Sequence, residues 1–90
     1  PKEIESFIDD MPGVDESAVI GVPHPDFGEA VVAVVVAKPS AKLNPESMIA
    51  ELKGKIANFK VPKRLIVVPE LPRNAMGKVQ KNILRQTYSQ

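Results

Sequence analysis

The sequence predicts an α+β domain in which about three helices cover a small three-stranded sheet. Two observations carry this prediction. Segments with apolar residues at helical spacing alternate with short runs of valine, alanine, isoleucine and leucine. Prolines, glycines and asparagines stand at the boundaries between these segments. With 90 residues, the chain is long enough for one small domain with a modest core.

The first half of the chain predicts a helix followed by two strands. The apolar stripe of the helix consists of Ile4, Phe7, Ile8 and Met11. Pro12-Gly13 ends the stripe, because proline and glycine both interrupt helices. The β-prone segment 16–22 and the run of valine and alanine over 30–37 predict two strands, the second buried on both faces. Residues 23–28 predict a turn or loop between them.

The second half predicts a helix, a strand and a last helix. Asn44-Pro45 marks a helix start, because asparagine caps helices and proline suits the first helical position. We expect this helix to run to about Asn58. Residues 65–68 predict the third strand. The last helix is expected to begin near Val79 or Gln80.

Composition excludes several classes of function. A net charge of +1 favours neither nucleic acid nor a membrane surface as a partner. The sequence has no cysteine, which excludes disulfides, thiolate catalysis and cysteine-based zinc sites and suits a reducing cytoplasm. No residues stand at the spacing of a metal site, so we expect none. The first residues read as the start of a helix without an initiator methionine, and we expect the chain to be a fragment of a longer protein.

The segment from Leu71 to Lys81 is the most informative for function. It places Lys78 directly after Gly77, between a proline-containing turn and the last predicted helix. Glycine adds no side chain and tolerates unusual backbone conformations, so we expect Lys78 on an exposed tip. A cation there would stabilise negative charge that develops on phosphorus or a carboxylate. A surface lysine in a hairpin loop is the alternative interpretation.

Three ordered segments of the chain carry a resemblance to a known family. They are Glu3-Ile4-Glu5 with residues 12–14, residues 16–23 and Gly28-Glu29, then residues 59–63, then residues 71–79 with Lys81, Leu84 and Arg85. Together they cover nearly the whole chain. They resemble the small C-terminal lid domain of the adenylate-forming superfamily, which comprises acyl-CoA synthetases, the adenylation domains of nonribosomal peptide synthetases and firefly-type luciferases.

The resemblance implies a two-step enzyme whose lid domain spans residues 1–90. A carboxylate attacks the α-phosphate of ATP to give an acyl-adenylate, and the thiol of coenzyme A then displaces AMP. The lid takes one orientation for the first step and rotates for the second. A large N-terminal domain, absent from this chain, is implied to hold ATP, Mg²⁺ and the acyl group, so the isolated domain is expected to be inactive. Residues 73–82 most resemble the malonyl-CoA synthetase branch, although Asn74 stands where threonine is usual.

The resemblance also implies roles for individual lysines. Lys78 matches the catalytic lysine that enters the active site during adenylation. Lys53 and Lys60 are candidates for contacting the phosphates of coenzyme A, with a solvated surface as the alternative. Lys78 is further implied as a target of a Gcn5-type acetyltransferase and a sirtuin-type deacetylase. Lys81 and Arg85 follow Lys78 at helical spacing and either dock the lid or keep the helix soluble.

Other functions remain open at the level of the sequence. The chain has no Walker-type phosphate loop, so a nucleotide site, if the resemblance holds, must lie on the other domain. The alternatives are a stand-alone interaction module, a substrate domain for lysine acylation, and the lid of a peptide synthetase or a luciferase-type enzyme.

Overall fold

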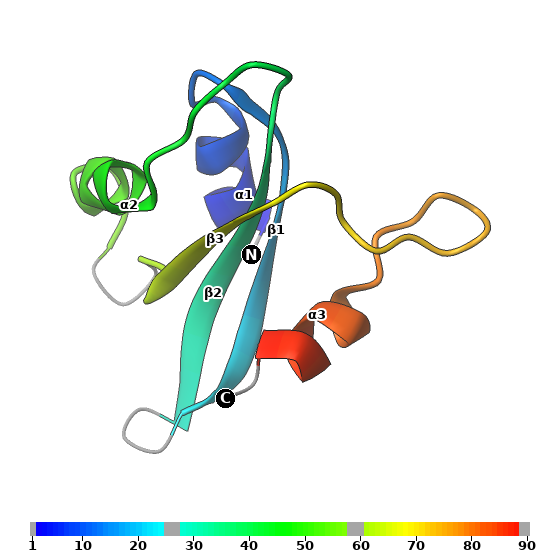
Figure 1. The fold of residues 1–90 in the computed structure, drawn as a ribbon. Helices are drawn as coiled ribbons and strands as arrows, with labels where there is room; N and C mark the ends of the chain where they lie inside the picture. The colour runs from blue at the N-terminus through cyan, green and yellow to red at the C-terminus, as the bar shows by residue number, and fades with distance from the viewer. Residues whose placement is uncertain (1, 25–27, 58–60, 89–90) are drawn as a thin grey trace.

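The computed structural model of the protein describes residues 2–24, 28–57 and 61–88 (Figure 1). In chain order the elements are α1 (Lys2–Asp9), β1 (Val14–His24), β2 (Gly28–Ala37), α2 (Pro45–Lys53), β3 (Arg64–Val68) and α3 (Lys81–Tyr88). The three strands form one mixed sheet in the order β1-β2-β3. The predicted α+β class, with three helices on a three-stranded sheet, is therefore confirmed.

The sheet owes its order to a hairpin followed by a helical connection. β1 and β2 are neighbours in sequence and pair antiparallel, with Val22 opposite Ala30. β3 returns after α2 and pairs parallel to β2, with Val34 opposite Ile66. This arrangement places β2 in the centre, so a valine-rich strand that is buried on both faces stabilises the structure.

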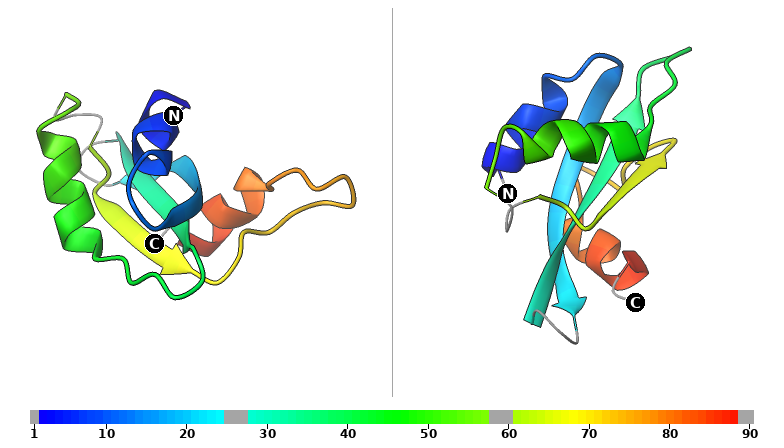
Figure 2. Two further views of the ribbon diagram at one scale, coloured as in Figure 1. Left: turned by 90° about the horizontal axis from the view of Figure 1, so that it is seen from above. Right: turned by 90° about the vertical axis from the view of Figure 1, so that its left-hand side faces the viewer.

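Helices cover both faces of the sheet (Figure 2). On one face, α1 and α2 enclose a core that includes Ile4, Ile8, Met11, Val14, Val19, Ala33, Val35, Met48, Leu52 and Leu65. On the other face, α3 and the segment before it enclose a second core that includes Ala18, Ile20, Val22, Ala30, Val32, Val34, Val36, Leu71 and Leu84. Successive residues of β2 pack alternately into the two cores, which explains why this strand has no polar face.

A β-bulge in β1 changes which face its first residues occupy. The pairing with β2 shifts between Val14 and Glu16. In a regular strand Val14 and Ala18 would share a face, but Val14 packs in the core under α1 and α2, whereas Ala18 packs under α3. Glu16 lies after the shift and in phase with Ala18, so it projects to the α3 side.

The predicted end of the second helix was wrong. The second helix ends at Lys53 rather than near Asn58, which lies outside the described residues. Gly54 follows the last helical residue, and a turn replaces the helix, in which the N–H groups of Lys55 and Ile56 both donate to the carbonyl of Leu52. Glycine is a weak helix former, which accounts for the early end. The predicted start at Asn44-Pro45 is confirmed, with the Asn44 side chain accepting a hydrogen bond from the N–H of Ser47.

The strands of the hairpin are longer than predicted. β1 continues to His24 and β2 begins at Gly28, so Pro23 is part of a strand, opposite Glu29. Proline is tolerated here because β1 is an edge strand, where a missing N–H leaves no partner unsatisfied. The first and last helices lie within two residues of their expected positions.

Candidate functional site

The connection between β3 and α3 projects from the body of the domain as a hairpin loop (Figure 1). Arg73 and Val79 form an antiparallel bridge at its base. Within the loop, the N–H of Asn74 donates to the carbonyl of Lys78 at 3.0 Å, and the N–H of Gly77 donates to the carbonyl of Asn74 at 2.9 Å. Gly77 has a φ of 82°, a conformation that favours glycine. The Gly-Lys pair therefore occupies an ordered, tightly hydrogen-bonded turn.

Lys78 lies at the exposed end of this turn, as the sequence predicts. Its backbone N–H donates to Asn74 Oδ1 at 3.0 Å. Over the part of the chain that the structure describes, no carboxylate lies within ion-pair distance of its ammonium group. Met76, two residues before Lys78, is 91% exposed, so the turn presents an apolar side chain as well as a cation to solvent.

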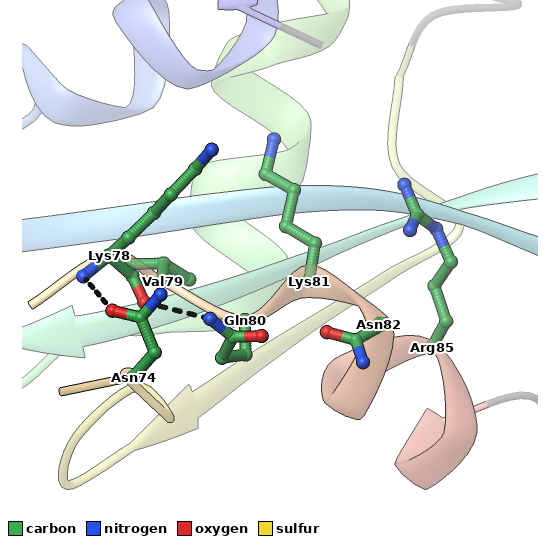
Figure 3. Close-up of a pocket in the computed structure, with 7 residues that line it drawn as sticks. All are labelled: Asn74, Lys78, Val79, Gln80, Lys81, Asn82 and Arg85. Atoms are coloured by element: carbon green, nitrogen blue, oxygen red, sulfur yellow. Dashed lines mark hydrogen bonds between the residues drawn. The ribbon is translucent and has the colours of Figure 1, made fainter. Parts of the chain in front are cut away.

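An open depression of about 620 Å³ lies beside the loop, at the beginning of α3. Its described lining residues are Asn74, Lys78, Val79, Gln80, Lys81, Asn82 and Arg85. Figure 3 shows the side chains of Lys78, Lys81 and Arg85 extending to the same side of the chain. Lys78 lies before the first residue of α3 and is not part of the helix. The three basic side chains nevertheless line the same surface, as their spacing in the sequence predicts.

The lining of this depression is basic and amide-rich. Among the described residues it contains two lysines, one arginine and three side-chain amides, and none of its lining residues is acidic. Lys81 forms an ion pair with Glu5, with 2.7 Å between its Nζ and the Glu5 Oε2. Lys78 and Arg85 have no such carboxylate in the described structure. An anionic group is therefore the kind of ligand that this surface would attract.

Glu5 links three elements near this site. Its Oε2 accepts a hydrogen bond of 2.7 Å from the N–H of Val19 and also pairs with Lys81. β1 is an edge strand, so the N–H of Val19 would otherwise point away from the sheet without a strand partner. A single carboxylate thus joins α1, the edge of β1 and the first residue of α3.

Replacing Glu5 by alanine is expected to lower the free energy of unfolding by about 1–3 kcal/mol, because the N–H of Val19 loses its acceptor. Glu5→Gln keeps an acceptor and loses only the ion pair with Lys81, so it should lower the free energy by about 1 kcal/mol or less. Urea unfolding of the chain measures both variants. Glu70→Ala, at an exposed loop carboxylate, is the control. Equal stability of Glu5→Ala and wild type would contradict this role for Glu5.

The other candidate lysines lie apart from Lys78. Lys53 is exposed at the end of α2, and α2 covers the face of the sheet opposite to α3 (Figure 2). Lys53 therefore does not contribute to the depression beside Lys78. Lys60 lies outside the described residues.

Two features of the site were not predicted from the sequence. Asn74 accepts hydrogen bonds from the N–H groups of both Met76 and Lys78 through one side-chain oxygen. An asparagine three residues before a glycine is a turn signal that could have indicated this role. The ion pair between Glu5 and Lys81 joins residues from opposite ends of the chain, and no local pattern signals it.

Within residues 2–24, 28–57 and 61–88, no group of three or more His, Asp or Glu side chains is arranged to hold a metal ion. None of the helices in those ranges combines the length and the apolar character needed to cross a bilayer.

Comparison with known proteins assigns the chain to a family. Residues 3–78 match the AMP-binding enzyme C-terminal domain. The crystal structure of ATP-bound MatB from Rhodopseudomonas palustris is similar over 99% of this chain and 18% of its own, with 61% identity and a TM-score of 0.95. A fatty acyl CoA synthetase of Mycobacterium tuberculosis is 40% identical over 99% of this chain and 18% of its own, with a TM-score of 0.89.

A curated CoA ligase is also similar over nearly the whole chain. The 3-[(3aS,4S,7aS)-7a-methyl-1,5-dioxo-octahydro-1H-inden-4-yl]propanoyl:CoA ligase of Rhodococcus jostii is 49% identical over 86 residues, which are 96% of this chain and 17% of that ligase. The chain thus spans less than a fifth of the length of these relatives. With its fold, its Gly-Lys hairpin and the match over residues 3–78, the chain belongs to the AMP-binding enzyme C-terminal domain family.

Proposed function

We propose that residues 1–90 form the C-terminal lid of an ATP-dependent carboxylate–CoA ligase, which is called the parent ligase below. One observation carries the proposal. In a chain of this family, Lys78 lies on an exposed, hydrogen-bonded turn, and its ammonium has no carboxylate partner in the described structure. The depression beside it has no acidic residue among its described lining residues. The parent ligase forms an acyl-adenylate from ATP and then an acyl-CoA thioester.

Lys78 acts in the first of these steps. As the carboxylate attacks the α-phosphate of ATP, negative charge is redistributed over the phosphate oxygens and pyrophosphate leaves. The compact ammonium of a lysine donates to a carboxylate oxygen and a phosphate oxygen together, which lowers the energy of the transition state. The nucleotide, Mg²⁺ and the acyl group are assigned to an N-terminal domain outside these 90 residues.

Malonate is the acid that we propose as the substrate. MatB, a malonyl-CoA synthetase, is 61% identical to this chain over the lid. The segment from Arg73 to Asn82, which contains the Lys78 turn, most resembles the same branch. Three curated relatives are named as CoA ligases for other acids, namely an indene-derived propanoate, a long-chain fatty acid and indoleacetate. The absence of cysteine from the sequence supports a cytoplasmic setting for the enzyme.

Pyrophosphate release by the parent ligase tests the proposal. The enzyme is incubated with ATP, Mg²⁺ and each member of a panel of short mono- and dicarboxylic acids, with and without coenzyme A. Release that depends on malonate, together with malonyl-CoA when coenzyme A is present, supports the proposal. If another acid supports release and malonate does not, that acid replaces malonate as the proposed substrate. No release with any acid would favour a stand-alone interaction module.

Lys53 is proposed to serve the second step, because it lies on the opposite side of the sheet from Lys78. If the lid rotates between steps, the α2 face and the Lys78 face meet the active site at different times. Lys53→Ala is expected to raise the KM for coenzyme A about two- to fivefold, which is the effect of one exposed charge-assisted contact. Adenylation should be unchanged.

Steady-state kinetics with varied coenzyme A measure this effect, and Lys42→Ala, at an exposed lysine in the loop before α2, is the control. An unchanged KM for coenzyme A would assign Lys53 to the solvated surface. Lys60 is also proposed to contact the phosphates of coenzyme A, and this proposal rests only on its positive charge.

Reversible acetylation of Lys78 is a second proposed use of the same residue. The exposed side chain without a described carboxylate partner is accessible to a Gcn5-type acetyltransferase, and a sirtuin-type deacetylase would reverse the change. Acetylation removes the positive charge that adenylation needs. Mass spectrometry after incubation with such an enzyme tests the proposal, and an unmodified Lys78 would overturn it.

A further inference from the structure

The Lys78 turn projects away from the sheet. The direction in which it presents Lys78 therefore depends on the contacts that hold the base of the hairpin. The loop leaves the body of the domain after β3 and returns at α3 (Figure 1). A catalytic group is effective only if its position relative to the substrate is fixed, because a displacement of about 1 Å costs roughly 100-fold in rate. The contacts between the loop and the sheet are therefore of functional interest.

The turn itself is held from within by Asn74. Its side-chain oxygen accepts hydrogen bonds from the N–H of Met76 at 2.9 Å and from the N–H of Lys78 at 3.0 Å. Its own N–H and carbonyl close the turn on Lys78 and Gly77. These four contacts fix the shape of the turn, but all of them lie inside it, so they do not fix its direction relative to the sheet.

Arg73 adds a polar connection to the sheet, beside the packing of Leu71 and Val79 against the second core at the base of the hairpin. One nitrogen of its guanidinium group donates to the carbonyl of Gly77 at 2.8 Å, directly before Lys78. Another nitrogen of the same group donates to the carboxylate of Glu16 on β1. Glu16 and Arg73 are 57 positions apart in the sequence, so this contact ties the loop to a distant strand.

The β-bulge of β1 makes this contact available. Glu16 follows the shift in pairing and is in phase with Ala18, whose side chain packs on the α3 side of the sheet. Glu16 therefore faces the side from which the hairpin projects. The Glu16 side chain is 31% exposed and the Arg73 side chain is 41% exposed, so solvent screens this pair only in part.

We infer that Arg73 and Glu16 are positioning residues that aim Lys78 at the reacting carboxylate and phosphate. The inference rests on the proposed function of Lys78. A planar guanidinium spans both acceptors at once, one on the turn and one on the strand. Lysine at this position has a single ammonium at the end of a flexible chain and would not hold the two acceptors in the same fixed geometry.

Arg73→Met in the parent ligase is expected to reduce the rate of adenylation about 10- to 100-fold. The KM for ATP and the rate of thioester formation from supplied acyl-adenylate should change less than about twofold, because Lys78 is proposed to serve only the first step. Arg73→Lys should recover only part of the loss. Lys55→Met is the matched control, because it removes an exposed ion pair with Glu51 on α2, at 3.3 Å.

A double variant tests whether the two residues act as one unit. Because Glu16 is proposed to act through Arg73, the variant that combines Glu16→Ala with Arg73→Met should lose no more adenylation than Arg73→Met alone. Independent, multiplicative losses would overturn the inference. So would an equal decrease in both half-reactions, which would indicate a general loss of structure.

Nitrogen-15 relaxation of the 90-residue chain gives a readout that does not depend on activity. The amide order parameter of Lys78 should be near 0.85 in the wild type and should fall below about 0.6 in Arg73→Met. An unchanged value would overturn the inference, whatever the kinetics show. If the wild-type parent ligase adenylates no acid, the proposed function fails, and the order parameters still decide whether Arg73 orders the loop.

Discussion

Replacing Lys78 by alanine is expected to reduce pyrophosphate release by the parent ligase about 100- to 1,000-fold, as is found when one preorganised donor to a developing charge is removed. Electrostatics set the lower bound. A pair of unit charges about 4 Å apart interacts by roughly 4 kcal/mol at an effective dielectric constant near 20. If half of this acts only in the transition state, the loss is already about 30-fold. Initial rates with saturating ATP and acid measure the effect.

The Lys78→Arg variant tests whether a positive charge at this position is sufficient or whether a lysine is required. Lys78→Arg keeps the charge on the exposed turn, but its broad guanidinium cannot occupy the position of a compact ammonium between two oxygens. We expect it to remain at least tenfold below the wild type. Lys38→Ala, at an exposed lysine after β2, is the control and should retain full activity. Activity of Lys78→Ala within twofold of the wild type would leave Lys78 as a surface residue.

The largest expected effect on stability comes from Leu52. This side chain is fully buried and, together with Met48, anchors α2 to the sheet. Leu52→Ala removes buried methyl and methylene groups and leaves a cavity, which costs about 2–5 kcal/mol. The total stability of a domain of this size is about 5–14 kcal/mol. The variant should therefore unfold at a midpoint about 10–30 °C lower than the wild type.

Thermal unfolding followed by circular dichroism measures this change. Leu52→Met preserves most of the volume and should cost less than about 1.5 kcal/mol. Ile83→Ala, in α3, removes a side chain that is 43% exposed and should cost less than Leu52→Ala. If Leu52→Ala and Leu52→Met had the same midpoint, α2 would not depend on the packing at this position.

Local patterns accounted for most of the fold. The apolar stripe of α1, the cap at Asn44 and the valine-rich run of β2 each act over a few residues, so each could be read without knowledge of the rest of the chain. The same is true of the Gly77-Lys78 turn, because the backbone requirement of a tight turn is local. The sequence therefore indicated the exposed position of Lys78 correctly.

Long-range contacts account for what could not be predicted. The β-bulge before Glu16 appears only when β1 is paired with β2. The contact between Glu16 and Arg73, and the ion pair between Glu5 and Lys81, join segments that are brought together by the folded sheet. The early end of α2 at Lys53 reflects the balance between continuing the helix through Gly54 and turning back to the sheet. Roles for Lys53, Lys60 and Lys78 stay predictions.

Thioester formation from a supplied acyl-adenylate tests the central claim most directly. Purified malonyl-adenylate and coenzyme A are mixed with the Lys78→Ala parent ligase, and malonyl-CoA is followed in a single turnover beside the wild type. If Lys78 serves only adenylation, the variant should form the thioester at a rate within about twofold of the wild type while its pyrophosphate release is nearly lost. An equal loss in both half-reactions would contradict a role for Lys78 confined to the first step.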